Sequence, residues 1–150
     1  MIFTLNAFTW MPSRGAWLPG VVVAEIGGAS ESVAAGIKVL LVEDNDHVAS
    51  DMTEMLEQAG YEVLGPAATV AAALAVIAST KPDAALLDLN LGGEMSYTLA
   101  DALVAGGIPF IITSGFIDEL PEKYRQHIVL PKPFMPKELF RCLKQAVPAA

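Results

Sequence analysis

The chain has 150 residues, which is enough for one domain whose core needs no disulfide or metal to hold it. Its 9 basic and 17 acidic residues give a net charge of −8, which argues against a surface that binds nucleic acid or anionic lipid. One cysteine and two histidines exclude an intramolecular disulfide and argue against a transition-metal site. These counts fit a reduced, cytoplasmic compartment.

Residues 1–36 differ in composition from the rest of the chain. They carry three charged residues and scattered aromatic side chains, among them Trp10 and Trp17. Their uncharged stretches are shorter than the roughly 20 residues that cross a bilayer, and the first residues lack the basic start of a secretion signal. We interpret residues 1–36 as a flexible N-terminal extension without membrane insertion. A partner-binding or anchoring arm is the alternative, because exposed tryptophans are costly.

From residue 37 to residue 147, short apolar runs alternate with stretches whose apolar residues recur at spacings of three and four. Thr69 and Ser96 are expected to cap helices, and Pro136 to lie in the first turn of the last helix. Between residues 115 and 126 only a weak helix, beginning at Pro121, is predicted. In chain order the other predicted elements are strand 37–42, helix 46–59, strand 61–65, helix 69–79, strand 83–88, helix 96–105, strand 109–114, strand 127–130 and the helix from 136.

The predicted strands are apolar throughout instead of alternating, which is typical of strands buried on both faces. Strands separated by helices form right-handed crossovers and pair in parallel. The sequence therefore predicts an α/β fold, an open doubly wound parallel sheet of five strands with helices on both faces.

Polar residues stand where the predicted strands end. Glu43 and Asp44 follow the first strand, and Asp88 ends the third. The fourth strand ends in Thr113 and Ser114, and Lys132 follows the fifth; Gly92-Gly93, after Asp88, is interpreted as a flexible turn. Because ligands of open parallel sheets bind at the carboxyl ends of the strands, these side chains are expected to meet in one site.

The charges of these residues predict their chemistry. Three carboxylates against one ammonium leave excess negative charge, and a site built from oxygen ligands suits Mg²⁺ or Mn²⁺. A metal that keeps water ligands beside a nucleophilic carboxylate is typical of phosphoryl transfer. A lysine and a hydroxyl can share the charge of the phosphoryl oxygens.

Four motifs in order resemble the response-regulator receiver domain of bacterial two-component signalling, and the likeness covers residues 37–147. The motifs are VLLVEDN at 39–45, AALLDLNL at 84–91, IITSG at 111–115 and PKPF at 131–134. The resemblance implies a flavodoxin-like domain that takes a phosphoryl group from a sensor histidine kinase or a histidine phosphotransfer protein. It also implies a signalling protein that promotes its own phosphorylation and dephosphorylation, with no separate catalytic domain.

The resemblance also implies roles for individual residues. Asp88 would accept the phosphoryl group, Asp44 would bind Mg²⁺ directly, and Glu43 would assist through water. Asn90 would offer its backbone carbonyl to the metal. Lys132 would contact the phosphoryl group, and the peptide bond that follows it would be cis.

The switch residues are expected at the end of the fourth strand. Ser114 takes the place of the switch hydroxyl, with Thr113 as the alternative. Receivers usually have an aromatic residue three positions before the lysine, where this chain has Val129. Phe116 or Tyr124 could supply the aromatic side chain instead.

Three further expectations concern function and reactivity. The motifs also resemble, more loosely, stand-alone receivers, so we expect a monomer or weak homodimer without an output domain. Two other classes of protein stay open: a phosphate-, nucleotide- or flavin-binding α/β module, and a weak phosphatase that uses Asp44 with Asp46 two residues on.

Cys142 shares a helical face with Glu138 and is expected to be at most half-buried, and nothing suggests a reactive thiol.

Overall fold

The computed structural model describes residues 36–147. The predicted N-terminal extension therefore lies, apart from Gly36, outside the described residues. The residues that are described belong to a compact unit that begins at Gly36.

The centre of this unit is a five-stranded sheet in the order β2-β1-β3-β6-β7, and every neighbouring pair is parallel. All five residues of β3 and all five of β6 are buried, as expected for central strands that are covered on both faces. The predicted α/β doubly wound, flavodoxin-like fold is confirmed. The strands are β1 (Lys38–Val42), β2 (Glu62–Ala67), β3 (Ala84–Asp88), β6 (Phe110–Ser114) and β7 (Ile128–Pro131).

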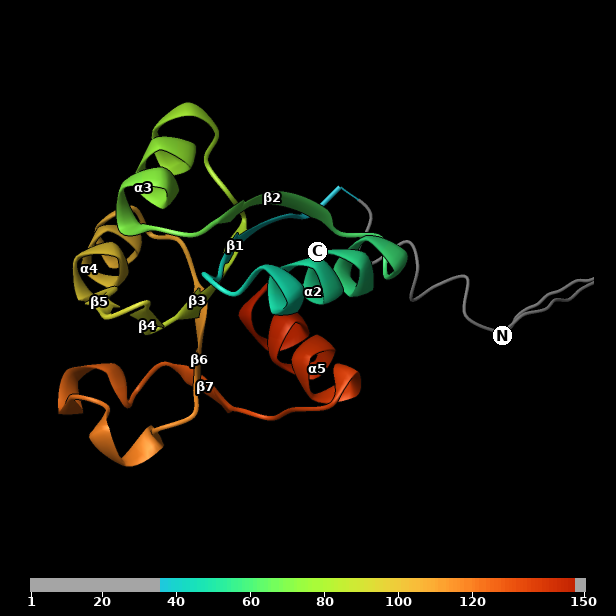
Figure 1. Ribbon diagram of the computed structural model, residues 1–150. Coiled ribbons are helices and arrows are strands. Elements are labelled where there is room, and N and C mark those ends of the chain that lie inside the picture. Colours follow the sequence, from blue (N-terminus) through green and yellow to red (C-terminus); the bar gives the residue numbers. More distant parts are fainter. Residues whose placement is uncertain (1–35, 148–150) are drawn as a thin grey trace, which may run out of the picture. The chain divides into compact units, whose positions relative to one another are not determined.

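Helices cover both faces of the sheet. Figure 1 shows α2 and α5 on one side of the strands and α3 and α4 on the other. Residues of α3 and α4 form a buried core with alternate residues of the strands, such as Leu40, Leu87 and Ile112. Among residues 36–147, every helix falls short of the length and apolar character that a membrane crossing needs. The helices are α2 (Asp46–Gln58), α3 (Val70–Ser79), α4 (Tyr97–Ala105) and α5 (Pro136–Ala146).

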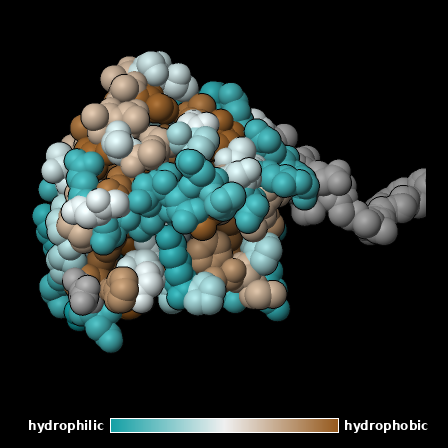
Figure 2. Space-filling view, in the orientation of Figure 1, coloured by the Kyte–Doolittle hydropathy of each residue, from teal (hydrophilic) through white to brown (hydrophobic). Residues whose placement is uncertain are grey.

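The outer surface of α2 is acidic. Asp46, Asp51, Glu54 and Glu57 are all exposed on this helix, which contains no lysine or arginine. In Figure 2 hydrophilic side chains form a band over the region of α2. This band accounts for part of the negative charge of the chain.

The structure adds a small hairpin that was not predicted. β4 (Asn90–Leu91) and β5 (Glu94–Met95) pair antiparallel between β3 and α4. The turn consists of Gly92 and Gly93, with φ of 64° and 99°. Two consecutive residues with positive φ are typical of the tight turn that joins a two-residue hairpin, and glycine adopts this backbone without a steric penalty. The glycine pair is therefore a defined turn and not merely a flexible one.

Two other local predictions are confirmed only in part. Ser96 stands at the N-cap of α4 but makes no capping hydrogen bond with its side chain. The weak helix predicted from Pro121 is a single 3₁₀ turn, η2 (Glu122–Tyr124), with Pro121 as its N-cap, and a second 3₁₀ turn that was not predicted, η1 (Ile117–Glu119), precedes it. Pro121 lies between them and, with its fixed φ and missing N–H, interrupts any continuous helix.

Cys142 also differs from the expectation of half-burial, since it is only 8% exposed. Its neighbour in the sequence, Leu143, is 1% exposed, so α5 buries a wider face than was predicted. Burial raises the pKa of the Cys142 thiol.

Candidate functional site

Most of the residues predicted from the strand ends line one hollow at the carboxyl edge of the sheet. Its volume is about 480 Å³, and we call it the strand-end cavity. Loops after β1, β3, β6 and β7 all contribute to it, because the carboxyl ends of parallel strands share one edge. The residues that line it are Asp44, Asp88, Asn90, Gly92, Gly93, Ser114, Gly115, Phe116 and Lys132.

Three carboxylates form a cluster at this edge. Glu43, Asp44 and Asp88 each offer an oxygen, and these oxygens lie within 4.8 Å of one another. Glu43 and Asp88 are buried, with 4% and 8% exposure, whereas Asp44 is exposed. Carboxylate groups this close repel one another unless a cation lies among them. The cluster is therefore a candidate cation site.

Lys132 supplies one positive charge to the cluster. Its Nζ lies 3.0 Å from Asp88 Oδ2 and 3.2 Å from Glu43 Oε2. Burial by itself lowers the pKa of Lys132, but hydrogen bonds and charge from Asp88 and Glu43 outweigh burial and raise it. The lysine is thus held charged. Its backbone N–H also donates to the carbonyl of Ser114, and its peptide bond with Pro133 is cis.

The environment of Glu43 is less favourable to charge. Burial is the largest influence and raises the pKa of Glu43, and the charge of Asp88 raises it further. The N–H of Asn45, 3.2 Å from Glu43 Oε1, and the ammonium of Lys132 act in the opposite direction. Three carboxylates against the one ammonium of Lys132 leave the site with excess negative charge, which leaves room for a second cation.

The donor set and the shape of the cavity fit Mg²⁺. Every candidate ligand is an oxygen, as this hard cation prefers, and the exposed position of Asp44 leaves space for water ligands. A β-carbon built on Gly92 would approach Asp44 Oδ2 to 3.3 Å. Glycine at this position therefore keeps a side chain away from the carboxylate, a role that the sequence analysis did not assign.

The hydroxyl at the cavity is that of Ser114. Ser114 lines the strand-end cavity, and its Oγ accepts a hydrogen bond from the N–H of Phe116 at 3.0 Å. Thr113 is 2% exposed and contributes nothing to the lining of the cavity. This placement favours Ser114 over Thr113 as the hydroxyl that can reach a bound group.

The two candidate aromatic residues occupy different environments. Phe116 lines the strand-end cavity and is 68% exposed. Tyr124 is 2% exposed, stacks on Tyr97 and donates a hydrogen bond to Asp101 Oδ1 at 2.9 Å. Phe116 is thus exposed at the cavity, whereas Tyr124 is packed and hydrogen-bonded against α4.

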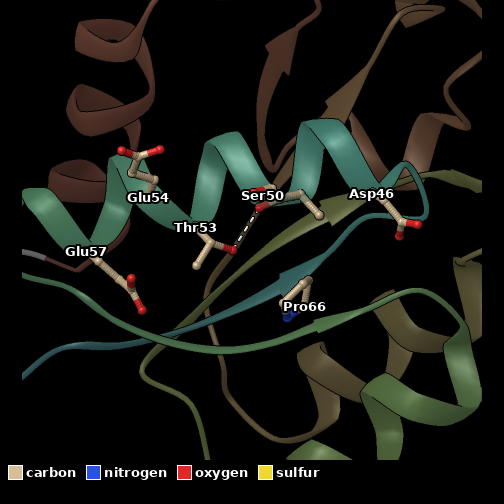
Figure 3. Close-up of a pocket in the computed structure, with 7 residues that line it drawn as sticks. Asp46, Ser50, Thr53, Glu54, Glu57 and Pro66 are labelled. Atoms are coloured by element: carbon tan, nitrogen blue, oxygen red, sulfur yellow. Dashed lines mark hydrogen bonds between the residues drawn. The ribbon is translucent and has the colours of Figure 1, made fainter.

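A second hollow argues against the phosphatase alternative. It lies between α2 and β2, has a volume of about 420 Å³ and is lined by Asp46, Thr53, Glu57 and Pro66 among others (Figure 3). Asp46 lines this hollow, whereas Asp44 lines the strand-end cavity. A nucleophile and a proton donor that act together must face the same substrate, and these two carboxylates line different cavities.

The nucleotide-binding alternative is also disfavoured by the start of α2. The side chain of Asn45 accepts hydrogen bonds from the N–H groups of His47 and Val48, at 3.0 and 3.1 Å. Phosphate sites at helix N-termini need such N–H groups free. Here a side chain already occupies them, and the adjoining residues are acidic.

Comparison with known proteins agrees with this geometry. A sequence model described as the response regulator receiver domain matches residues 39–144. The solved structure of SdrG from Sphingomonas melonis Fr1 is 36% identical, with a TM-score of 0.67, over 74% of this chain and 96% of that one. The response regulator PhyR from Brucella abortus is 28% identical, with a TM-score of 0.69, over 79% of this chain and 51% of that one.

Among curated proteins, the transcriptional regulatory protein PdtaR of Mycobacterium tuberculosis is 28% identical over 115 residues, 73% of this chain and 56% of its own. The chain therefore spans little more than half the length of that relative. The match to the family covers most of the chain and includes all four motifs at the strand-end cavity. The chain belongs to the response regulator receiver domain family.

Proposed function

We propose that this protein is a phosphorylation-activated signalling switch in which Asp88 accepts a phosphoryl group in a reaction that requires Mg²⁺. The donor is a phosphohistidine of a sensor kinase or of a histidine phosphotransfer protein. The observation that carries the proposal is the position of Asp88, which lines one cavity with Lys132 and Asp44 and whose carboxylate lies close to that of the buried Glu43.

The environment of Asp88 suits it for attack on phosphorus. Oδ1 accepts a hydrogen bond from the N–H of Asn90 at 3.2 Å, and Oδ2 accepts one from Lys132. These two bonds fix the plane of the carboxylate. An Asp88 oxygen would form the new P–O bond while the P–N bond to the donor imidazole breaks. The electron pair of that bond stays on the imidazole nitrogen, which then takes up a proton.

The other residues of the cavity would stabilise the charge that develops on the phosphoryl oxygens. Bound Mg²⁺, held directly by Asp44 and Asp88 and through water by Glu43, would neutralise part of it. The Asn90 side chain already accepts a hydrogen bond from Gly93 N–H at 2.7 Å, so its backbone carbonyl is the group that we assign to the metal. Lys132 would contact one phosphoryl oxygen and the hydroxyl of Ser114 another.

The direct test is incubation with a small phosphodonor and Mg²⁺, followed by intact mass and peptide mapping. We expect one added phosphoryl group, on Asp88, and none when Mg²⁺ is chelated. Asp88→Asn should abolish the modification, and Asp51→Asn, on the exposed face of α2, serves as the matched control. An Asp88→Asn variant that is labelled as well as the wild type would show that the acceptor is wrongly assigned.

A further inference from the structure

Ser96 has an unusual position for a residue at the start of a helix. It is fully buried, with 0% exposure, and stands at the N-cap of α4. A serine at this place normally accepts hydrogen bonds from the first N–H groups of the helix. Here the side chain makes no such bond. The hydroxyl is therefore used for something other than ending the helix.

The hydroxyl of Ser96 instead donates towards the backbone of the phosphoacceptor strand. Its Oγ lies 2.8 Å from the carbonyl oxygen of Asp88 and 3.1 Å from that of Leu89. The N–H of Ser96 also donates to the Leu89 carbonyl, at 2.9 Å. Ser96 thus binds the two peptide groups that follow the Asp88 Cα and closes the base of the β4–β5 hairpin.

These peptide groups determine where the ligands of the site lie. The N–H of Asn90 donates to Asp88 Oδ1, and the N–H of Gly93 donates to Asn90 Oδ1. The Asn90 N–H belongs to the same peptide group as the Leu89 carbonyl that Ser96 binds, so a rotation of that group would break the first of these bonds and shift Asn90. No other side chain among residues 36–147 donates a hydrogen bond to the Asp88 or Leu89 carbonyl.

We propose that Ser96 is a positioning residue for phosphoryl transfer: its hydroxyl holds the Asp88 and Leu89 carbonyls so that the Asp88 carboxylate and the Asn90 carbonyl stay aimed at the strand-end cavity. The proposal rests on the function proposed for Asp88. Ser96 is buried beneath the hairpin and is not among the residues that line the cavity, so it acts through Asp88 and Asn90.

The test compares Ser96→Ala and Ser96→Cys, which remove the strong donor, with Ser96→Thr, which keeps the hydroxyl. Ser79→Ala is the matched control, because the Ser79 hydroxyl also donates to a backbone carbonyl, that of Val76, far from the site in sequence. In the metal-free protein, amide exchange at Asn90 and Gly93 should become at least about 10-fold faster in the Ala and Cys variants, with other amides of the sheet unchanged.

With Mg²⁺ and a small phosphodonor, the Ala and Cys variants should show half-saturating Mg²⁺ concentrations raised about 10-fold, the range for residues that orient metal ligands. Labelling of Asp88 should slow by a similar factor, and Ser96→Thr should restore both. Unchanged exchange at Asn90 together with wild-type Mg²⁺ dependence in Ser96→Ala would overturn the proposal, even if the melting temperature fell. Failure of the wild type itself to be labelled would overturn the proposed function, while the exchange experiment would still test the role of Ser96 in the metal-free protein.

Discussion

The ammonium of Lys132 lies 3.0 Å from Asp88 Oδ2, although Asp88 ends β3, Lys132 follows β7, and β6 lies between these two strands. The same ammonium is 3.2 Å from Glu43 Oε2. One cation therefore joins two buried carboxylates from the ends of different strands, and its charge offsets part of theirs.

Replacing Lys132 with Gln should destabilise the metal-free protein. The change leaves the buried carboxylates of Glu43 and Asp88 without a cation, and we expect a loss of roughly 1–2 kcal/mol, since part of the lysine is exposed to screening by water. Addition of Mg²⁺ should reduce the deficit because the metal supplies the missing charge. Urea unfolding with and without Mg²⁺ measures both effects.

Lys123→Gln is the matched control for this measurement. Lys123 also pairs with a carboxylate, Asp101, but both side chains are more than half exposed. Its replacement should change stability little, with or without Mg²⁺. Equal losses in the two variants would mean that the charge of Lys132 has no special role at the strand-end cavity.

Mg²⁺ affinity should depend on Asp44 more than on Glu43. Asp44→Ala removes a ligand that we assign to direct contact, whereas solvent can partly replace a contact made through water in Glu43→Gln. Calorimetric titration should show no measurable binding in the first variant and weakened binding in the second. Mg²⁺ should also raise the melting temperature of the wild type, because the native state alone presents the assembled site. Wild-type affinity in Asp44→Ala would contradict the metal assignment.

Cys142 should be a poorly reactive thiol in the folded protein. It is 8% exposed, and burial raises its pKa, so both access and the thiolate fraction are low at neutral pH. Reaction with a chromogenic disulfide reagent should be at least about 10-fold slower in buffer than in denaturant, where the thiol is accessible and has its ordinary pKa. Reaction at equal rates would mean that α5 opens readily.

The positions of the polar side chains at the strand-end cavity could be predicted from the sequence because they depend on one general property of parallel sheets. Each strand is a recognisable apolar run, and the residue after it must lie at the carboxyl edge of a parallel sheet. Asp44, Asp88, Ser114 and Lys132 were placed in this way, and all of them line the strand-end cavity. The sequence alone was thus enough to predict that these residues, which lie far apart along the chain, share one site.

Local choices that depend on tertiary contacts were harder to predict. The Gly92-Gly93 pair is a hairpin signal, but the flanking strands have two residues each, too few to show any pattern. Ser96 satisfies the usual rule for a helix cap, and only the proximity of the Asp88 carbonyl redirects its hydroxyl. A sequence does not show whether such a hydroxyl accepts from the N–H groups of the helix or donates to a carbonyl, because this depends on which groups the fold brings close to it.

The segment after β6 illustrates the same limit. Its two 3₁₀ turns are held by contacts with residues distant in the sequence, such as the stacking of Tyr124 on Tyr97. Arg125 also donates to the carbonyl of Leu120, at 3.0 Å, and ties the two turns together. The spacing of apolar residues reveals neither kind of contact, so the sequence of this segment predicted only a weak helix.

The last prediction concerns the response of this segment to phosphorylation. Ser114 Oγ accepts a hydrogen bond from Phe116 N–H, and Phe116 is 68% exposed. A phosphoryl group on Asp88 would attract the Ser114 hydroxyl, and the movement would pass to Phe116 through Gly115, which adapts its backbone without a side-chain clash. Tyr124 should stay in place because its hydroxyl is bonded to Asp101.

Amide exchange with Mg²⁺ and beryllofluoride, a mimic of the phosphoryl group, should therefore show changes that centre on residues 114–120 and fade before Tyr124. Ser114→Ala should abolish these changes while the mimic still binds at Asp88, because the hydroxyl is the link between the cavity and the loop. Thr113→Val is the matched control, since Thr113 is buried outside the cavity lining, and it should leave the changes intact. Exchange differences confined to α2, with none in residues 114–120, would place the switch elsewhere in the domain.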